Sequence, residues 1–176
     1  ATARAAAPGI LWSTVAFAGT LGLSRSLVRE QQTGCIDGLL LAPMDRTAIF
    51  FGKAAGNLFF IFVVECILLP LFAGLFNVPL LQPGVLLITV LGTVGYAAVG
   101  TLLAAMAVNT RAREVLLPVL LLPLAFPVLI AGVRAAGILL DGGTLTEAGG
   151  WVHLIVLYDL LILAVSTLTF GYVLEE

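Results

Sequence analysis

Five apolar runs, separated by short polar segments, dominate this sequence and restrict what it can fold into. They cover about residues 8–23, 49–76, 80–108, 115–140 and 151–174. A helix needs about 20 apolar residues to cross the hydrocarbon core of a bilayer, and only the first run is shorter than this. Runs longer than the core thickness are accommodated by tilting or kinking. We therefore expect an all-α polytopic membrane protein in which residues 1–176 form a single transmembrane domain.

The scarcity of charge leads to the same expectation. Of the 176 residues, 61% are hydrophobic and 10% are charged, and the mean hydropathy is +1.16. A water-soluble domain carries about 25% charged residues, so this chain has too little polar surface to cover a globule in water. It offers no basic patch for nucleic acid and no hydrophilic stretch for a separate catalytic module. The two cysteines, Cys35 and Cys66, are too few for a disulfide framework.

Three prolines, Pro118, Pro123 and Pro127, lie inside the fourth run. They would break a helix in water, because each removes a backbone hydrogen bond. A membrane helix tolerates them when neighbouring groups satisfy the freed carbonyls. We therefore expect the fourth span to remain one helix.

Basic residues are concentrated in the segments on one side of the membrane. Six of the eight lie in segment 24–48, in loop 109–114 or just inside the second run: Arg25, Arg29, Arg46, Arg111, Arg113 and Lys53. The positive-inside rule places these segments in the cytoplasm and the 77–83 turn and the 141–150 loop outside. Trp12 and Trp151 then fall at the outer interface, where we expect an aromatic belt.

Segment 24–48 is too polar to span a membrane and too apolar for a plain loop. Ile36, Leu39, Leu40 and Pro43 follow a helical spacing and form one apolar face, which predicts a short amphipathic helix at the inner interface. Asp45 is a suitable N-cap for the following span. The helix could anchor the loop to the membrane surface, or it could bind a cytoplasmic partner. Periodicity alone leaves both interpretations open.

The same segment carries a resemblance to a known family. The positions that match the coupling segment of ABC-2-type permeases are Glu30, Gly34, Asp37, Leu40, Pro43 and Arg46, followed by Gly52 and Lys53. The stretch from Gly38 to Lys53, the 109–118 loop and the ending 170–176 resemble the heme exporter protein B (cytochrome c maturation protein B) family. Residues 35–37 read Cys-Ile-Asp where family members commonly have Thr-Leu-Glu.

The resemblance implies an ABC-2 (type V exporter-like) permease with six spans, so the family's first span is expected to be missing here. It implies a homodimer in the bacterial inner membrane that binds a cytoplasmic ATP-binding subunit through segment 24–48, with Arg29 beside the matching positions. It further implies a heme-handling membrane subunit and a small single-span subunit as partners. ATP hydrolysis would be coupled to heme delivery or to release of a heme-loaded periplasmic chaperone.

The residues are consistent with a complex in which a different subunit, and not this chain, is the ATP-hydrolysing enzyme. A phosphate-binding P-loop requires G-x-x-x-x-G-K-[ST], whereas Lys53 is the only lysine and Ala54 follows it. We therefore expect ATP to be bound by the partner subunit.

Three charged residues lie well inside the predicted spans: Glu65, Asp159 and Arg134. Such residues are costly in a membrane, so a functional or paired role is the default for Glu65, with a protonated structural carboxyl as the alternative. Arg134 could pair with Asp159. Alternatively, Arg134 extends to the outer surface and Asp159 bonds a neighbouring helix, which we favour.

No heme or metal site is expected in this chain. His153 is the only histidine, and neither Met44 nor Met106 makes a convincing axial pair with it. Heme would then be handled by the complex and not ligated here.

Small residues predict two helix-packing faces. One has Thr93, Ala97, Thr101 and Ala105 at every fourth position, and the other is the Gly52-x-x-x-Gly56 pair. Packing within the subunit is the favoured use, with a homodimer contact as the alternative.

Two other functions compete with the permease. An ion-gradient-driven transporter could use Glu65 and Asp159 as proton carriers, but it predicts inverted repeats that the sequence does not display. A non-transporting assembly scaffold would share the partner subunits but move no substrate.

Overall fold

The fold is a bundle of long helices, as the apolar runs predicted. The computed structural model describes residues 2–32, 46–107 and 113–173. The helices in these ranges are α1 (Thr2–Gln32), α3 (Arg46–Phe76), α4 (Pro83–Ala107), α5 (Arg113–Leu140) and α6 (Gly149–Val173). Each contains a stretch long and apolar enough to cross a membrane. The prediction of an all-α multi-pass membrane protein is confirmed.

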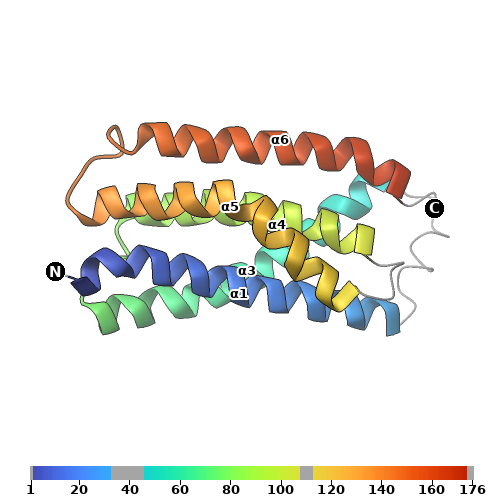
Figure 1. The fold of residues 1–176 in the computed structure, drawn as a ribbon, viewed down its shortest axis with the longest axis horizontal. Helices are drawn as coiled ribbons and strands as arrows, with labels where there is room; N and C mark the ends of the chain where they lie inside the picture. Colours follow the sequence, from blue (N-terminus) through green and yellow to red (C-terminus); the bar gives the residue numbers. More distant parts are fainter. Residues whose placement is uncertain (1, 33–45, 108–112, 174–176) are drawn as a thin grey trace.

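The helices alternate in direction, so the ends of the bundle separate the connecting segments into two groups. Figure 1 shows α1, α4 and α6 beginning at the left end and finishing at the right, with α3 and α5 running back. The 77–82 turn and the 141–148 loop lie at the left end. At the turn, α3 ends because Asn77 adopts the left-handed conformation, with φ of 51°. This arrangement is the alternation that the positive-inside argument required.

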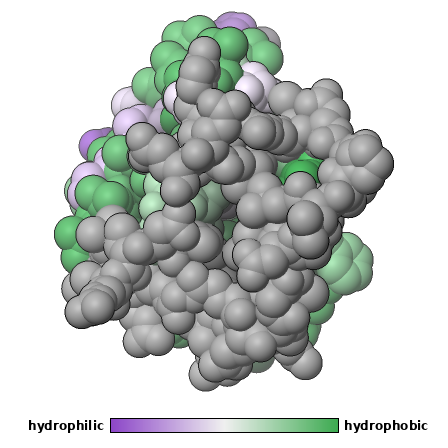
Figure 2. Space-filling model, turned by 90° about the vertical axis from the view of Figure 1, so that its right-hand side faces the viewer, coloured by the Kyte–Doolittle hydropathy of each residue, from purple (hydrophilic) through white to green (hydrophobic). Residues whose placement is uncertain are grey.

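Helix α4 is the centre of the bundle. It packs against α1, α3, α5 and α6, and its side chains are buried along most of its length. Helices α3 and α6 lie at the periphery and expose large apolar side chains, among them Phe59, Ile67 and Leu168. In Figure 2, which looks onto the end where α6 finishes, hydrophobic side chains predominate among the described residues in view. Such an apolar exterior suits a lipid environment.

The two helix ends that flank the predicted coupling segment differ from the expected spans. Helix α1 continues to Gln32, beyond the apolar run that was expected to end near residue 23. The added residues 24–32 contain no glycine or proline, so nothing in them stops the helix. Helix α3 begins at Arg46, slightly before the expected residue 49. The amphipathic helix predicted over residues 36–43 lies outside the described residues.

Helix α5 remains one helix through all three of its prolines, as expected. Figure 1 shows that it bends along its length. Near this region the hydroxyl of Tyr158 on α6 donates to the carbonyl oxygen of Leu124 at 2.8 Å. Pro127 has no N–H to bond the carbonyl of Pro123, and Leu124 is the next residue, so this bond from α6 reaches the α5 backbone beside an interruption of the helical ladder.

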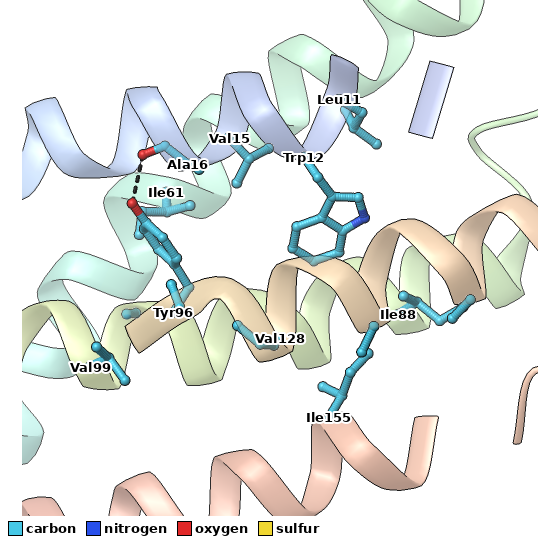
Figure 3. Close-up of a cluster of buried hydrophobic side chains, with 14 of the residues drawn as sticks. Leu11, Trp12, Val15, Ala16, Ile61, Ile88, Tyr96, Val99, Val128 and Ile155 are labelled. Atoms are coloured by element: carbon cyan, nitrogen blue, oxygen red, sulfur yellow. Dashed lines mark hydrogen bonds between the residues drawn. The ribbon is translucent and has the colours of Figure 1, made fainter. Parts of the chain in front are cut away.

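The expectation that Trp12 belongs to an interfacial aromatic belt is wrong. Its side chain is 2% exposed and lies inside the bundle (Figure 3). The indole packs against Gly92 of α4 and Gly132 of α5. A Cβ atom at Gly132 would lie 2.5 Å from Cζ2 of the indole, so only glycine leaves room for it there. Trp12 is thus a core residue whose place depends on the absence of side chains on two neighbouring helices.

Candidate functional site

A layer of polar side chains surrounds the middle of α4. Glu65 of α3 is 1% exposed, and its Oε1 is hydrogen-bonded to the hydroxyl of Thr93 on α4. The Thr93 hydroxyl also lies 2.7 Å from the carbonyl oxygen of Thr89. The other carboxyl oxygen of Glu65, Oε2, has no hydrogen-bond partner among the described residues. The one acidic residue of α3 within its apolar stretch therefore faces the centre of the bundle and not the lipid.

A second polar contact joins the same two helices. The side-chain amide of Asn57 donates to the hydroxyl oxygen of Thr101 at 2.9 Å, and that hydroxyl donates to the carbonyl oxygen of Ala97 at 2.7 Å. Asn57 lies eight residues before Glu65 on α3, and Thr101 lies eight residues after Thr93 on the antiparallel α4. A single alignment of α3 with α4 therefore brings both pairs of side chains into contact.

Helix α1 is attached to α4 by a third set of hydrogen bonds. The hydroxyl of Tyr96 donates to the carbonyl oxygen of Ala16 at 2.6 Å, as Figure 3 shows. The hydroxyls of Tyr96 and Thr20 are 2.7 Å apart, and the Thr20 hydroxyl also lies 2.7 Å from the Ala16 carbonyl oxygen. Tyr96 and Thr20 are 1% and 6% exposed, so these bonds form away from water.

Asp159 meets α4 on the side of α6. It is 6% exposed, and its Oδ1 approaches Gly95 so closely that a Cβ atom there would clash with it. This oxygen has no hydrogen-bond partner among the described residues. Arg134 is exposed on α5, and no ion pair joins it to Asp159. The two residues therefore do not form the pair that was considered. Arg134 is exposed, as favoured, but the expected hydrogen bond from Asp159 to a neighbouring helix is not found among the described residues.

The two predicted packing faces differ in what covers them. Thr93, Ala97 and Thr101 are buried within the subunit, where Thr93 and Thr101 contact α3. Gly52 and Gly56 are exposed, and a Cβ atom at either would meet no described atom within 4 Å. The favoured use of this glycine pair in packing within the subunit is therefore not found.

Half of the eight predicted coupling positions lie outside the described residues: Gly34, Asp37, Leu40 and Pro43. Arg29 and Glu30 fall in the last turn of α1, Arg46 is the first residue of α3, and Lys53 lies two turns further on. The segment between α1 and α3 thus leads directly into α3, which carries Asn57 and Glu65.

The described residues bring together no group of three side chains that could hold a metal ion. His153 is exposed in the first turns of α6, whereas Met106 is exposed at the last turn of α4. Because these turns lie at opposite ends of the bundle, the two side chains cannot bind the two faces of one heme (Figure 1). Met44 lies outside the described residues.

The sequence reasoning missed three residues of the polar layer: Thr20, Asn57 and Tyr96. The signal for Asn57 was present, since its eight-residue spacing from Glu65 places both on one helix face. Thr20 and Tyr96 gave no such signal, because a hydroxyl in an apolar run commonly bonds its own helix.

Comparisons with known proteins identify the family. The family model described as CcmB protein matches residues 1–176. A heme exporter protein B of Rhodobacter capsulatus is 35% identical over 131 residues, which cover 73% of this chain and 59% of that protein. The heme exporter protein B of Pseudomonas aeruginosa is 30% identical over 165 residues, covering 93% of this chain and 72% of the relative.

A third relative, heme exporter protein B of Bradyrhizobium diazoefficiens, is 32% identical over 139 residues, or 77% of this chain and 61% of its own length. This chain therefore spans less than two thirds of the length of the Rhodobacter and Bradyrhizobium relatives. No solved structure matches the chain. Because the family model covers every residue and the relatives agree with it, this multi-pass membrane chain belongs to the CcmB protein family.

Proposed function

We propose that this chain is the membrane-spanning permease subunit of an ABC transporter complex for cytochrome c biogenesis in the bacterial inner membrane. A partner subunit binds and hydrolyses ATP, and this chain transmits the resulting movement across the membrane. The output is heme delivery or release of a heme-loaded periplasmic chaperone, aided by a heme-handling membrane subunit and a small single-span subunit. Two copies of this chain form the permease.

The observation that carries this proposal is the match of the CcmB family model to the whole chain, with relatives named heme exporter protein B. The arrangement of the helices supports it. The segment that resembles an ATPase-coupling segment lies between α1 and α3, and α3 contacts the central α4 through Glu65 and Asn57. A movement of that segment would therefore be transmitted through α3 to the centre of the bundle.

The gradient-driven transporter is less well supported. Glu65 and Asp159 meet α4 at Thr93 and Gly95, which are two residues apart in a helix and so point to different sides of it. A proton carrier pair is expected to share one path, and these two carboxyls are separated by α4 itself. The non-transporting scaffold shares every partner with the permease and differs only in whether heme crosses.

The test of the proposal is charge reversal at the start of α3. Arg46→Glu in the full-length protein, co-expressed with its ATP-binding partner, is expected to lower cytochrome c yield by at least ten-fold. The loss of one charge-assisted contact at an interface typically lowers binding affinity by about this factor or more, and cytochrome c yield is expected to fall with the affinity for the ATP-binding subunit. The variant should still insert in the membrane, because Arg46 precedes the apolar part of α3.

The matched control is Asp141→Arg, a charge reversal at the opposite end of the bundle, where Asp141 is exposed. It should leave cytochrome c yield unchanged. Mild-detergent purification of both variants then shows how much ATP-binding subunit is bound. This subunit should co-purify with the Asp141→Arg control and be recovered in a smaller amount with Arg46→Glu. Purification without any ATP-binding subunit, even from the unaltered protein, would contradict the permease role.

A further inference from the structure

The two polar contacts between α3 and α4 have the same geometry, and we call each contact a rung: Asn57–Thr101 is the first rung and Glu65–Thr93 is the second. Asn57 meets Thr101 and Glu65 meets Thr93, with eight residues between the rungs on each helix. Ile61 and Ala97, at the midpoint of both intervals, are each 2% exposed. In each rung a side chain of α3 reaches a threonine hydroxyl of α4, and that hydroxyl lies 2.7 Å from the carbonyl oxygen four residues earlier in α4.

The first rung fixes the direction in which protons are donated. The amide nitrogen of Asn57 can only donate, so the hydroxyl of Thr101 accepts from it. The single proton of Thr101 is then free to go to the carbonyl oxygen of Ala97. Each of the two hydrogen bonds in this rung then has one proton between its donor and its acceptor.

The second rung closes in the same way only if Glu65 carries a proton. An ionised carboxylate and a carbonyl are both acceptors, and the Thr93 hydroxyl has one proton to share between Glu65 Oε1 and the Thr89 carbonyl. One of the two close oxygen pairs would then have no hydrogen between its members. A protonated Glu65 donates to Thr93, and Thr93 donates to Thr89, as in the first rung.

Among the described residues, no basic side chain forms an ion pair with Glu65 that would stabilise a negative charge. The residue is 1% exposed, and its Oε2 has no partner among the described residues. The nearest basic residue along α3, Lys53, is twelve residues away, or about 18 Å along the helix axis. Arg134 is exposed on α5, and Thr93 is the one side chain seen to bond Glu65 in the described part of the chain. A buried charge without a partner is strongly disfavoured.

We propose that Glu65 is a proton-binding site inside the membrane: its side chain is held as the neutral carboxylic acid and serves as the hydrogen-bond donor of the second α3–α4 rung. It acts there as Asn57 acts in the first rung. The inference rests on hydrogen-bond geometry and is independent of the partner subunits and of what the complex transports.

Infrared spectroscopy of the full-length protein in lipid nanodiscs in D₂O tests this inference. The wild-type protein should have a carboxylic-acid C=O stretching band that is lost in Glu65→Gln. The matched control is Asp159→Asn, which removes the other carboxyl that is buried among the described residues and should retain the Glu65 band. A loss from the carboxylate region in Glu65→Gln, with no change in the carboxylic-acid region, would overturn the proposal.

A stability series gives a second readout. The amide of Glu65→Gln can donate to Thr93 as the acid does, so its Tm should stay close to that of the wild type. Glu65→Met has a similar length but no donor, and its Tm should fall by several degrees. If Glu65→Gln loses as much stability as Glu65→Met, the acid is not replaceable by a neutral donor and the proposal is wrong.

Discussion

At the scale of single residues, the bundle depends on positions where one side chain is seated against the backbone of another helix. Trp12 lies between Gly92 and Gly132, and Asp159 lies against Gly95. Close helix approach at glycine is a general way to pack membrane helices, because no hydrophobic force holds them together in lipid. In this chain the glycines make room for a large or polar side chain of the neighbouring helix.

Two glycines of α5 allow this interpretation to be tested with one type of substitution. Gly132→Ala should destabilise the protein by about 1–3 kcal/mol, since its new methyl group would overlap the rigid indole of Trp12. Gly137→Ala, five residues later on the same helix, should be neutral or slightly stabilising, because its methyl group meets nothing within 4 Å. Thermal unfolding in detergent measures both, and equal unfolding temperatures would show that the Trp12 contact does not restrict Gly132.

At the scale of helices, α4 is the element to which the others are attached. Its threonines and Tyr96 hydrogen-bond to α3 and α1, so polar groups that an isolated helix would turn to its own carbonyls also connect the bundle. Such bonds in membrane proteins are individually modest, with measured values that average about 0.6 kcal/mol. Several of them around one helix nevertheless specify its rotation, because only one orientation satisfies them all.

The α1–α4 connection should behave as one coupled unit. Tyr96→Phe is expected to cost about 0.6–1.7 kcal/mol of stability, the range for hydrogen bonds between membrane helices. In a double-mutant cycle with Thr20→Val, the two losses should be less than additive, because both hydroxyls share the Ala16 carbonyl.

Thr14→Val provides the control for this cycle. The Thr14 hydroxyl bonds the Ile10 carbonyl of its own helix and is not seen to bond α4. Combined with Tyr96→Phe, it should give additive losses in urea or thermal unfolding. Additivity in the Thr20 cycle as well would mean that the two hydroxyls do not act together.

At the scale of the whole molecule, the bundle has two chemically different ends. The polar segments 24–48 and 109–114 carry most of the basic residues and connect helices at one end, while the 141–148 loop lies at the other end with Asp141 and Glu147 exposed. A membrane protein with this distribution of basic residues is expected to keep the basic end in the cytoplasm. The same end would then meet any cytoplasmic partner.

Cysteine labelling in intact cells measures this orientation. With Cys66 changed to serine, native Cys35 should react with a membrane-impermeant maleimide only after the membrane is opened. In a chain with both native cysteines replaced, Thr144→Cys should react in intact cells, because Thr144 is exposed in the 141–148 loop. The reverse pattern would invert the topology and place the segment that resembles a coupling helix on the wrong side for an ATP-binding partner.

Local information in the sequence determined the number, order and alternation of the helices. Hydropathy is summed over adjacent residues, so five apolar runs predict five spans without knowledge of their neighbours. Helix continuity through Pro118, Pro123 and Pro127 followed from the same reasoning about the membrane. The family resemblance was also readable, because it depends on residues that are close in sequence.

Only the tertiary structure decided which face of each helix is buried and what each polar group contacts. Trp12 was expected at an interface and lies in the core, since its place depends on two glycines about 80 and 120 residues away in sequence. Which residue bonds Glu65 depends on the register between α3 and α4. The exposure of Gly52 and Gly56 depends on which face of α3 the other helices leave uncovered. These relations are set by the rotation and offset of long helices, and an almost uniformly apolar chain carries little local signal for either.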